Sequence, residues 1–217
     1  MKTLFRFLPA LLAAVLIFQT AGCSSVYYAA YEKVGVYKRD LLKKRVIEAR
    51  DDQKEAQTQF KDALTRLKEI TKFEGSQAES AYRSLKSEYD DCVKQADAVH
   101  SRIRAVESVS TDLFAEWEKE IGEIGTPSLA AASRQQLSAT RARYTELHAS
   151  LVAAEQTMTP VLKQFNDYVL YLKHNLNAQA IASLKGEATN ITTEINRLIE
   201  QMNKSIARAD EFVKQMN

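Results

Sequence analysis

Apolar residues recur along most of this chain at alternating steps of four and three positions. The first stripe runs from Leu42 to Ile70, and Gln53 is its one polar member. It comprises Leu42, Val46, Ala49, Gln53, Ala56, Phe60, Ala63, Leu67 and Ile70. The residues beside it are mostly charged or polar, and an apolar repeat of about 3.5 residues with polar flanks is typical of a coiled-coil seam. The pattern therefore predicts a long amphipathic helix.

Three more stripes with the same spacing follow. The second comprises Ala78, Tyr82, Leu85, Tyr89, Cys92, Ala96, Val99, Ile103, Val106, Ser110, Leu113 and Trp117. The third comprises Leu137, Thr140, Tyr144, Leu147, Leu151, Ala154, Met158, Val161, Phe165, Tyr168 and Leu172. The fourth comprises Ile181, Leu184, Ala188, Ile191, Ile195, Leu198, Met202, Ser205 or Ile206, Ala209, Phe212 and Met216. Together with the first stripe, they predict four long helices.

Breaks in the pattern separate the stripes. In the first break, residues 73–76, Ser76 with Glu79 has the sequence signature of a capping box at the start of the next helix. In the second, residues 122–127, Thr126 can cap the third helix, and a proline follows in the first turn, where proline is tolerated. Both segments therefore predict turns between helices.

The third break, residues 173–177, contains no glycine, so one continuous helix through it is the competing interpretation. Folding the chain at the first break pairs Phe60 with Tyr89. Folding it at the third pairs Phe165 with Ala188, so that a large side chain meets a small one, as a packed seam requires. The stripes therefore predict two antiparallel hairpins.

These observations predict an all-α fold of elongated antiparallel coiled-coil hairpins, at about residues 37–122 and 128–217, within one helical domain over 37–217. The second hairpin carries apolar residues beside its seam, so its wider apolar face needs a partner. If the first hairpin is that partner, the chain forms a four-helix bundle. Another copy of the chain, in a homo-oligomer, is the alternative.

The amino-terminal residues have the order of a secretory signal: a short basic region, an apolar run and small residues before Cys23. Residues 20–23 resemble the lipobox of bacterial lipoproteins, although Thr20 stands where leucine is usual. We therefore expect residues 1–22 to be a signal peptide and 23–36 a lipidated anchor and short linker, with palmitate and other acyl chains on Cys23. Ser24 resembles lipoproteins that are sorted to the periplasmic side of the outer membrane. A plain signal peptide and a retained anchor helix are the alternatives.

The net charge of +2 includes Lys2 and Arg6, which lie in the expected signal peptide. Without them the chain has 28 basic and 28 acidic residues. A neutral chain with interspersed charges lacks the basic surface that binds phosphate backbones, so we expect no nucleic-acid partner.

The sequence offers no catalytic constellation. No histidine or cysteine pair has the spacing of a metal site, and neither a nucleophile elbow nor a phosphate-binding loop is present, so we expect no metal, cofactor or nucleotide and no enzymatic activity. Cys92 is the one thiol left besides Cys23, and its place in the second stripe predicts a buried apolar role, with pairing between chains as the alternative. The polar stripe members hint at a site inside the bundle, although such residues more often set the register. They are Gln53, Ser110, Thr140 and Ser205.

Antiparallel helices place the first and third breaks at the end of the bundle far from Cys23. We therefore expect partner contacts at the residues of those two turns, and a closing cluster or a membrane-interface belt of aromatic residues at the other end. The expected contact residues are Phe73, Glu74, Gly75, Lys173, His174 and Asn175. The aromatic residues are Tyr27, Tyr28, Tyr31, Tyr37, Phe114 and Trp117.

Two stretches, residues 27–40 and 172–184, resemble a family of proteobacterial lipoproteins known as domain of unknown function 2959. The resemblance extends over the whole mature chain and implies a helical envelope protein. Some members are labelled DNA repair ATPases, but the family supplies no catalytic residues to carry over.

These observations favour a non-enzymatic, lipid-anchored envelope protein that acts as a helical spacer, scaffold or partner-binding module. One alternative is a membrane-active protein whose amphipathic helices open and insert, because residues 161–172 have a wide apolar face. Another is an envelope enzyme or ligand carrier with a site inside the bundle.

Overall fold

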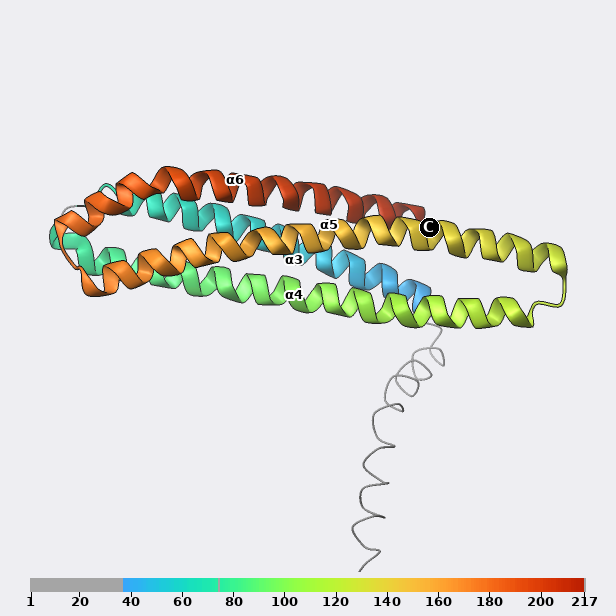
Figure 1. Cartoon of the computed structure of the whole chain (residues 1–217). Helices are drawn as coiled ribbons and strands as arrows, with labels where there is room; N and C mark the ends of the chain where they lie inside the picture. Colours follow the sequence, from blue (N-terminus) through green and yellow to red (C-terminus); the bar gives the residue numbers. More distant parts are fainter. Residues whose placement is uncertain (1–36, 74, 217) are drawn as a thin grey trace, which may run out of the picture. The chain divides into compact units, whose positions relative to one another are not determined.

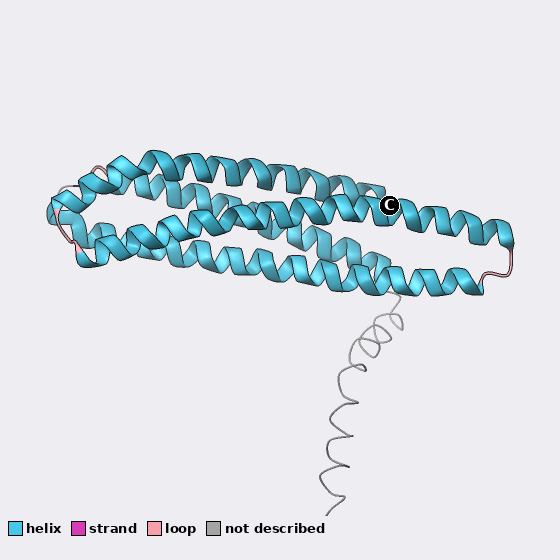
Figure 2. Cartoon of the chain, in the orientation of Figure 1, coloured by secondary structure: helices cyan, strands magenta, loops and turns pink. Residues whose placement is uncertain are grey.

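The computed structural model describes residues 37–73 and 75–216, and these form four long α-helices and one short 3-10 helix, with no strand among them. The elements are α3 (Lys38–Ile70), η2 (Gly75–Gln77), α4 (Ala78–Glu123), α5 (Pro127–His174) and α6 (Ala178–Gln215). Figure 2 shows the helices joined by short connections. Residues 42–217 form one compact unit, and of the other unit, residues 1–41, the structure describes little more than the start of α3. The predicted all-α fold is confirmed.

The interior of the bundle is built from the four stripes. In α3 every stripe member from Leu42 to Ile70 is buried, including the polar Gln53. The largest side chains with almost no exposure come from all four helices, and they include Phe60, Leu85, Phe165 and Ile191. Because the buried residues recur with the coiled-coil spacing, the apolar periodicity explains both the helices and the faces that they bury.

Each helix lies between two antiparallel neighbours, so the four close into a bundle (Figure 1). Main packing surfaces join α4 to α5 and α5 to α6. Side-chain bonds join α3 to both remaining neighbours: Gln59 Nε2 donates to Glu88 of α4 at 2.9 Å, and Gln57 Nε2 donates to Asn203 Oδ1 of α6 at 2.8 Å. The first hairpin is therefore the partner of the second hairpin within the chain. Of the apolar residues beside the second seam, Val169 is buried, whereas Leu170 stays exposed.

The helix ends differ in part from the predicted caps. The capping box is wrong: Gln77, not Ser76, occupies the cap position of α4, and its side chain makes no capping hydrogen bond. Glu79 instead pairs with Arg83 one turn further along α4. Thr126 does occupy the cap position of α5, but its side chain makes no capping hydrogen bond either. The cap position of α5 is thus where the sequence predicts it, whereas that of α4 is one residue later than predicted.

The third break is a turn and not a continuous helix. The helix α5 ends at His174, and Asn177 caps α6 by accepting a hydrogen bond from the Ala180 backbone N–H at 3.0 Å. Asparagine is among the preferred residues at this position. The chain therefore reverses without the glycine whose absence favoured the competing interpretation.

The helices α4 and α5 have 46 and 48 residues, while α6 has 38, so the α4–α5 hairpin extends beyond the carboxyl end of α6 (Figure 1). Aromatic residues join the two helices at this end. Trp117 donates its indole N–H to Ser133 at 2.9 Å, and the buried Phe114 ring lies edge-on to Tyr144. Both side chains therefore make contacts between α4 and α5 at this end. Of the other aromatic residues expected here, only Tyr37 lies within the described residues; Tyr27, Tyr28 and Tyr31 do not.

Candidate functional site

The structure brings the two turns that the sequence singles out to the same end of the bundle. The short helix η2, which lies in the first turn, contacts both α4 and α6. In Figure 1 the α3–α4 and α5–α6 connections lie side by side at the end opposite the α4–α5 turn. Of the six expected contact residues, Glu74 lies outside the described residues, as does Cys23, the expected lipidation site. The other five belong to this end, which we call the paired-turn end.

Hydrogen bonds fix the backbone of the α5–α6 turn. The Asn175 backbone N–H donates to the Leu172 carbonyl at 3.2 Å, and its side-chain amide donates to the Tyr171 carbonyl at 2.9 Å. Two residues further on, Asn177 starts α6. Asn175 is therefore engaged in holding the turn, whereas Lys173 and His174 are exposed and available for a contact.

Large apolar side chains stand exposed on this turn and in the last part of α5 before it. Leu170 is 47% exposed, Tyr171 39% and Leu176 47%, and they make up three of the five large hydrophobic residues that stand exposed among the described residues. The Tyr171 hydroxyl lies 3.4 Å from Ser183 Oγ on α6, so its ring leans across the two helices. Exposed apolar residues that cluster indicate a contact surface, whereas single ones are ordinary.

Sequence reasoning did not include Leu170 and Tyr171 among the expected contacts, and it included Leu176 only as part of the turn at residues 173–177. The sequence places both residues beside the stripe, next to its member Leu172, but it does not show whether a neighbouring helix covers them. The stripe identifies inward positions well. It carries less information about apolar residues outside it, because most of those, unlike Leu170, are covered by a neighbouring helix.

The α3–α4 turn contributes a second, more polar part of this end. After α3, the Phe73 backbone N–H donates to the Ile70 carbonyl at 3.0 Å, and the Phe73 side chain is half-buried. Lys72 beside it is exposed. Within the described part of the chain, neither Lys72 nor Lys173 forms an ion pair with any residue.

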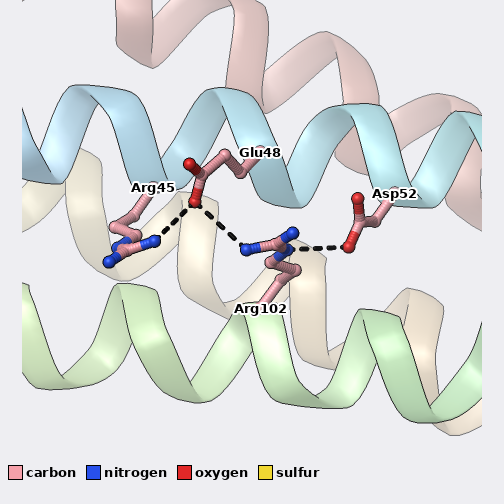
Figure 3. Close-up of polar contacts among 4 residues, drawn as sticks. All are labelled: Arg45, Glu48, Asp52 and Arg102. Atoms are coloured by element: carbon pink, nitrogen blue, oxygen red, sulfur yellow. Dashed lines mark hydrogen bonds and ion pairs between the residues drawn. The ribbon is translucent and has the colours of Figure 1, made fainter.

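A cluster of charged residues links the first half of α3 to α4 (Figure 3). Arg102 on α4 donates through Nε to Asp52 at 2.8 Å and through a terminal nitrogen to Glu48 at 3.3 Å. Arg45 donates to the same Glu48 oxygen at 2.8 Å. The hydrogen bond to Asp52 raises the pKa of Arg102 above its ordinary value. Each carboxylate is thus matched by a guanidinium, which suits a structural link between helices better than acid–base chemistry.

Two histidines join α4 to α5. His148 lies 2.6 Å from Glu107, and His100 lies 2.5 Å from Glu155. Neither has a second carboxylate or a thiol beside it, and among the described residues no group of three or more histidine, cysteine, aspartate or glutamate side chains could hold a metal ion. These contacts are therefore pairwise links across one interface.

Cys92 lies inside the bundle, as its place in the second stripe predicts. Its side chain is fully buried, and burial raises the pKa of the thiol to about 12. The nearest acceptor is the Gln59 carbonyl of α3, at 4.0 Å from the sulfur. A thiol that stays protonated and enclosed is unsuited to nucleophilic chemistry.

The polar stripe members divide into two groups. Ser110 donates to the Glu107 carbonyl at 2.8 Å, and Thr140 accepts from Arg143 at 3.1 Å. Gln53 and Ser205 are fully buried, and their side-chain polar atoms have no hydrogen-bond partner within the described part of the chain. Of the four polar stripe members, only Gln53 and Ser205 therefore remain as candidates for a polar site inside the bundle.

One open hollow lies between α4 and α5 near the α4–α5 turn. Its volume is about 320 Å³, and Ile121, Leu137, Arg134 and Arg141 are among the residues that line it. Arg141 is already engaged, since its guanidinium donates to Glu118 at 2.7 Å and lies over the Phe114 ring. The hollow therefore offers fewer free groups than the paired-turn end.

No described helix combines the length and the apolar character that crossing a bilayer requires. Comparison of the chain with curated proteins and with solved structures finds no match. A family model described as a protein of unknown function (DUF2959) matches residues 27–216, and the chain belongs to that family.

Proposed function

We propose that this protein is a non-enzymatic lipoprotein of the bacterial envelope, anchored through Cys23 on the periplasmic side of the outer membrane. In this proposal the helical bundle is a spacer. It holds the paired-turn end away from the anchor and presents that end to another component of the envelope.

The observation that carries the proposal is the gathering of exposed residues at the paired-turn end. Leu170, Tyr171 and Leu176 lie there beside the exposed Lys173 and His174. The backbone of the turn is fixed by its own hydrogen bonds, so these side chains are presented on a rigid support. A rigid surface loses little conformational freedom on binding, which favours a contact.

The length of the helices supports the role of a spacer. The helix α3 has 33 residues, which corresponds to about 50 Å at 1.5 Å per residue. The chain that follows Cys23 enters the bundle at the start of α3, and the paired-turn end begins where α3 stops. If the chain is tethered at Cys23, the length of α3 therefore separates the tethered end of the bundle from the paired-turn end by tens of ångströms.

The lipid anchor has its own test. Cells that express the chain and are fed labelled palmitate should incorporate label into the wild type and not into a Cys23→Ser variant. Label that still enters the variant would refute the assignment of Cys23.

Site-specific photocrosslinking in cells tests the contact surface. A photoreactive residue at position 174 or 75 should give a defined crosslinked product that contains another envelope component. The matched control is position 197, because Arg197 is 68% exposed and lies on α6 away from the turns. Products that contain only a second copy of the chain, or the same products from position 197, would contradict the proposal.

The membrane-active alternative has less support. It relied on the apolar face of residues 161–172, but Val161, Phe165, Val169 and Leu172 are buried in the bundle. Opening the bundle would expose them at a large cost in buried apolar area. Leakage of a dye from vesicles at high protein concentration would support this alternative, and intact vesicles would exclude it.

A further inference from the structure

The α5–α6 turn combines exposed apolar side chains with a local excess of positive charge. Residues 168–186 contain no aspartate or glutamate, but they contain Lys173, His174 and Lys185. All three basic side chains are exposed. A segment that is basic and apolar at once, and free of acidic residues, is complementary to an anionic surface and not to a cationic one.

The acidic residues around this end lie outside the α5–α6 turn, and one of them, Glu74, is outside the described residues. Glu69 is engaged by Arg66 at 2.8 Å, and Glu79 is engaged by Arg83. Asp167 and Glu187 border the acid-free segment, six residues before and ten residues after the turn at 173–177; Glu187 accepts a hydrogen bond from the neutral amide of Asn190, which leaves its charge in place. Lys72, Lys173 and Lys185 form no ion pair with any described residue.

The apolar side chains are exposed, and none of them lines the hollow between α4 and α5. Leu176 lies in the turn itself, after the end of α5 and before the start of α6. Leu170 and Tyr171 lie one turn of helix earlier, and the Tyr171 hydroxyl faces Ser183. A layer of lipid headgroups deforms around protruding side chains, so it needs no pocket of matching shape. Leucine, tyrosine and lysine side chains together are also typical of segments that lie at a bilayer interface.

We propose that the α5–α6 turn docks on a bilayer that contains anionic phospholipids. Leu170, Tyr171 and Leu176 enter the headgroup layer, and Lys173 and Lys185 contact the phosphates. The inference rests on the proposed function, because it names the component that the paired-turn end contacts. Together with acylation at Cys23, it makes the protein a bridge between two lipid surfaces. An acidic protein surface is the competing partner. If it is the true partner, vesicles that contain lipid alone will not be captured.

A vesicle-tethering assay tests the proposal with the acylated full-length protein. The protein is first reconstituted through its lipid anchor into vesicles of phosphatidylcholine. Labelled vesicles of phosphatidylcholine with about one third phosphatidylglycerol, or of phosphatidylcholine alone, are then added, and co-sedimentation of the label is measured. We expect the anionic vesicles to be captured and the neutral ones not. Capture should fall as sodium chloride is raised from about 50 to about 500 mM, because salt screens the charges.

Two double variants assign the effect to the turn. Each lysine near an anionic surface strengthens binding by roughly fivefold, so Lys173→Gln with Lys185→Gln should weaken capture by about 25-fold. Lys119→Gln with Lys214→Gln makes the same change in charge away from this end and should leave capture unchanged. Leu176→Ser tests the apolar part and should also weaken capture. Circular dichroism of each variant verifies that the helices are intact.

The outcomes separate this inference from the proposed function. Equal capture of neutral and anionic vesicles, or full capture by the Lys173 and Lys185 double variant, would overturn the docking proposal. A defined protein crosslinked from position 174 without any vesicle capture would also overturn it, while leaving the spacer function intact. Failure of the protein to enter the first vesicles would instead contradict the lipid anchor.

Discussion

Gln53 is the residue whose replacement gives the sharpest test of the bundle. Its side chain has no exposed surface, and neither its amide nitrogen nor its oxygen has a hydrogen-bond partner in the described part of the chain. Its level in the bundle is fixed by its neighbours on α3: Arg50 binds Asp210 of α6 at 2.7 Å, and Gln57 binds Asn203 of α6 at 2.8 Å. Ser205 of α6 lies between those two partners and is likewise buried and unpaired. Gln53 and Ser205 therefore form one polar layer in an apolar interior.

The substitution Gln53→Leu should stabilise the protein. A buried polar group without a hydrogen bond costs about 1–3 kcal/mol relative to one that is paired or removed. Leucine has a similar volume to glutamine, so the replacement brings little overpacking. We therefore expect the free energy of unfolding to rise by about 1–3 kcal/mol. For a protein of this size, each kcal/mol corresponds to about 2–4 °C in Tm.

Urea and thermal unfolding, followed by far-ultraviolet circular dichroism, measure this change. The matched control is Gln57→Leu, which makes the same substitution one helical turn later in α3. The Gln57 amide nitrogen donates to Asn203 Oδ1 at 2.8 Å and to the Ile199 carbonyl at 3.3 Å. Losing these bonds should lower the free energy of unfolding by about 0.5–1.5 kcal/mol. The two substitutions are thus expected to have opposite signs.

A fall in stability on Gln53→Leu would refute the reasoning, because it would mean that the amide has favourable interactions that leucine cannot replace. Ser205→Ala adds an independent check from the other side of the layer. It removes the unpaired hydroxyl and should be neutral or stabilising. If both substitutions destabilise the protein, the polar groups of this layer are satisfied in solution and are not unpaired.

Further predictions concern the rest of the interior and its charged links. Phe60→Ala and Phe165→Ala should each lower the free energy of unfolding by about 3–5 kcal/mol, because both side chains are fully buried, whereas Leu176→Ala at an exposed site should change it by less than about 0.5 kcal/mol in urea titrations. Burial raises the pKa of the Cys92 thiol to about 12, so its contribution to stability should be complete below about pH 8.5 and be lost as the pH rises towards 12. In urea titrations above about pH 9, Cys92→Ala should therefore lose less of its free energy of unfolding than the wild type. Equal losses in the two proteins would contradict burial of the thiol. Arg102→Met should cost less than about 1 kcal/mol at low salt, since the Arg102 side chain is 39% exposed, and the difference from the wild type should shrink in about 1 M sodium chloride.

The four helices could be predicted because their inward faces repeat along the chain. Most stripe positions, such as Phe60 in α3 and Ile195 in α6, are buried for the same reason: an apolar face with a coiled-coil period is removed from water only against another such face. Tyr82, Tyr89 and Tyr144 are among the stripe members that are only half-buried. The antiparallel order follows from short connections between long helices. Short connections also place the two predicted turns at one end, so the position of the candidate site could be predicted from the sequence.

Helix caps were less predictable. Ser76 and Glu79 have the correct spacing for a capping box, but the chain forms the short helix η2 before α4 and Glu79 pairs with Arg83. The side chain that does cap a helix is Asn177 at the start of α6. It lies in a segment without glycine, so the sequence left a continuous helix there as an alternative. A capping side chain contributes about 1 kcal/mol, which competing local pairs and turns can match. An apolar face that repeats along a whole helix contributes far more free energy, because every turn buries another side chain, so its structure survives such competition.

Apolar residues outside the stripes illustrate what a periodic pattern omits. Ile199 and Leu170 both lie beside a stripe. At Ile199, α3 packs along α6, and Gln57 donates a hydrogen bond to the Ile199 carbonyl. Leu170, in contrast, is 47% exposed. The difference depends on which helix is the neighbour at that level and on where each helix ends, and neither is encoded by the local period. The same argument explains why Gln53 and Ser205 meet in one layer, since their levels are set by bonds between α3 and α6. Inward faces are a property of single helices, whereas exposed clusters and buried polar layers are properties of the assembled bundle.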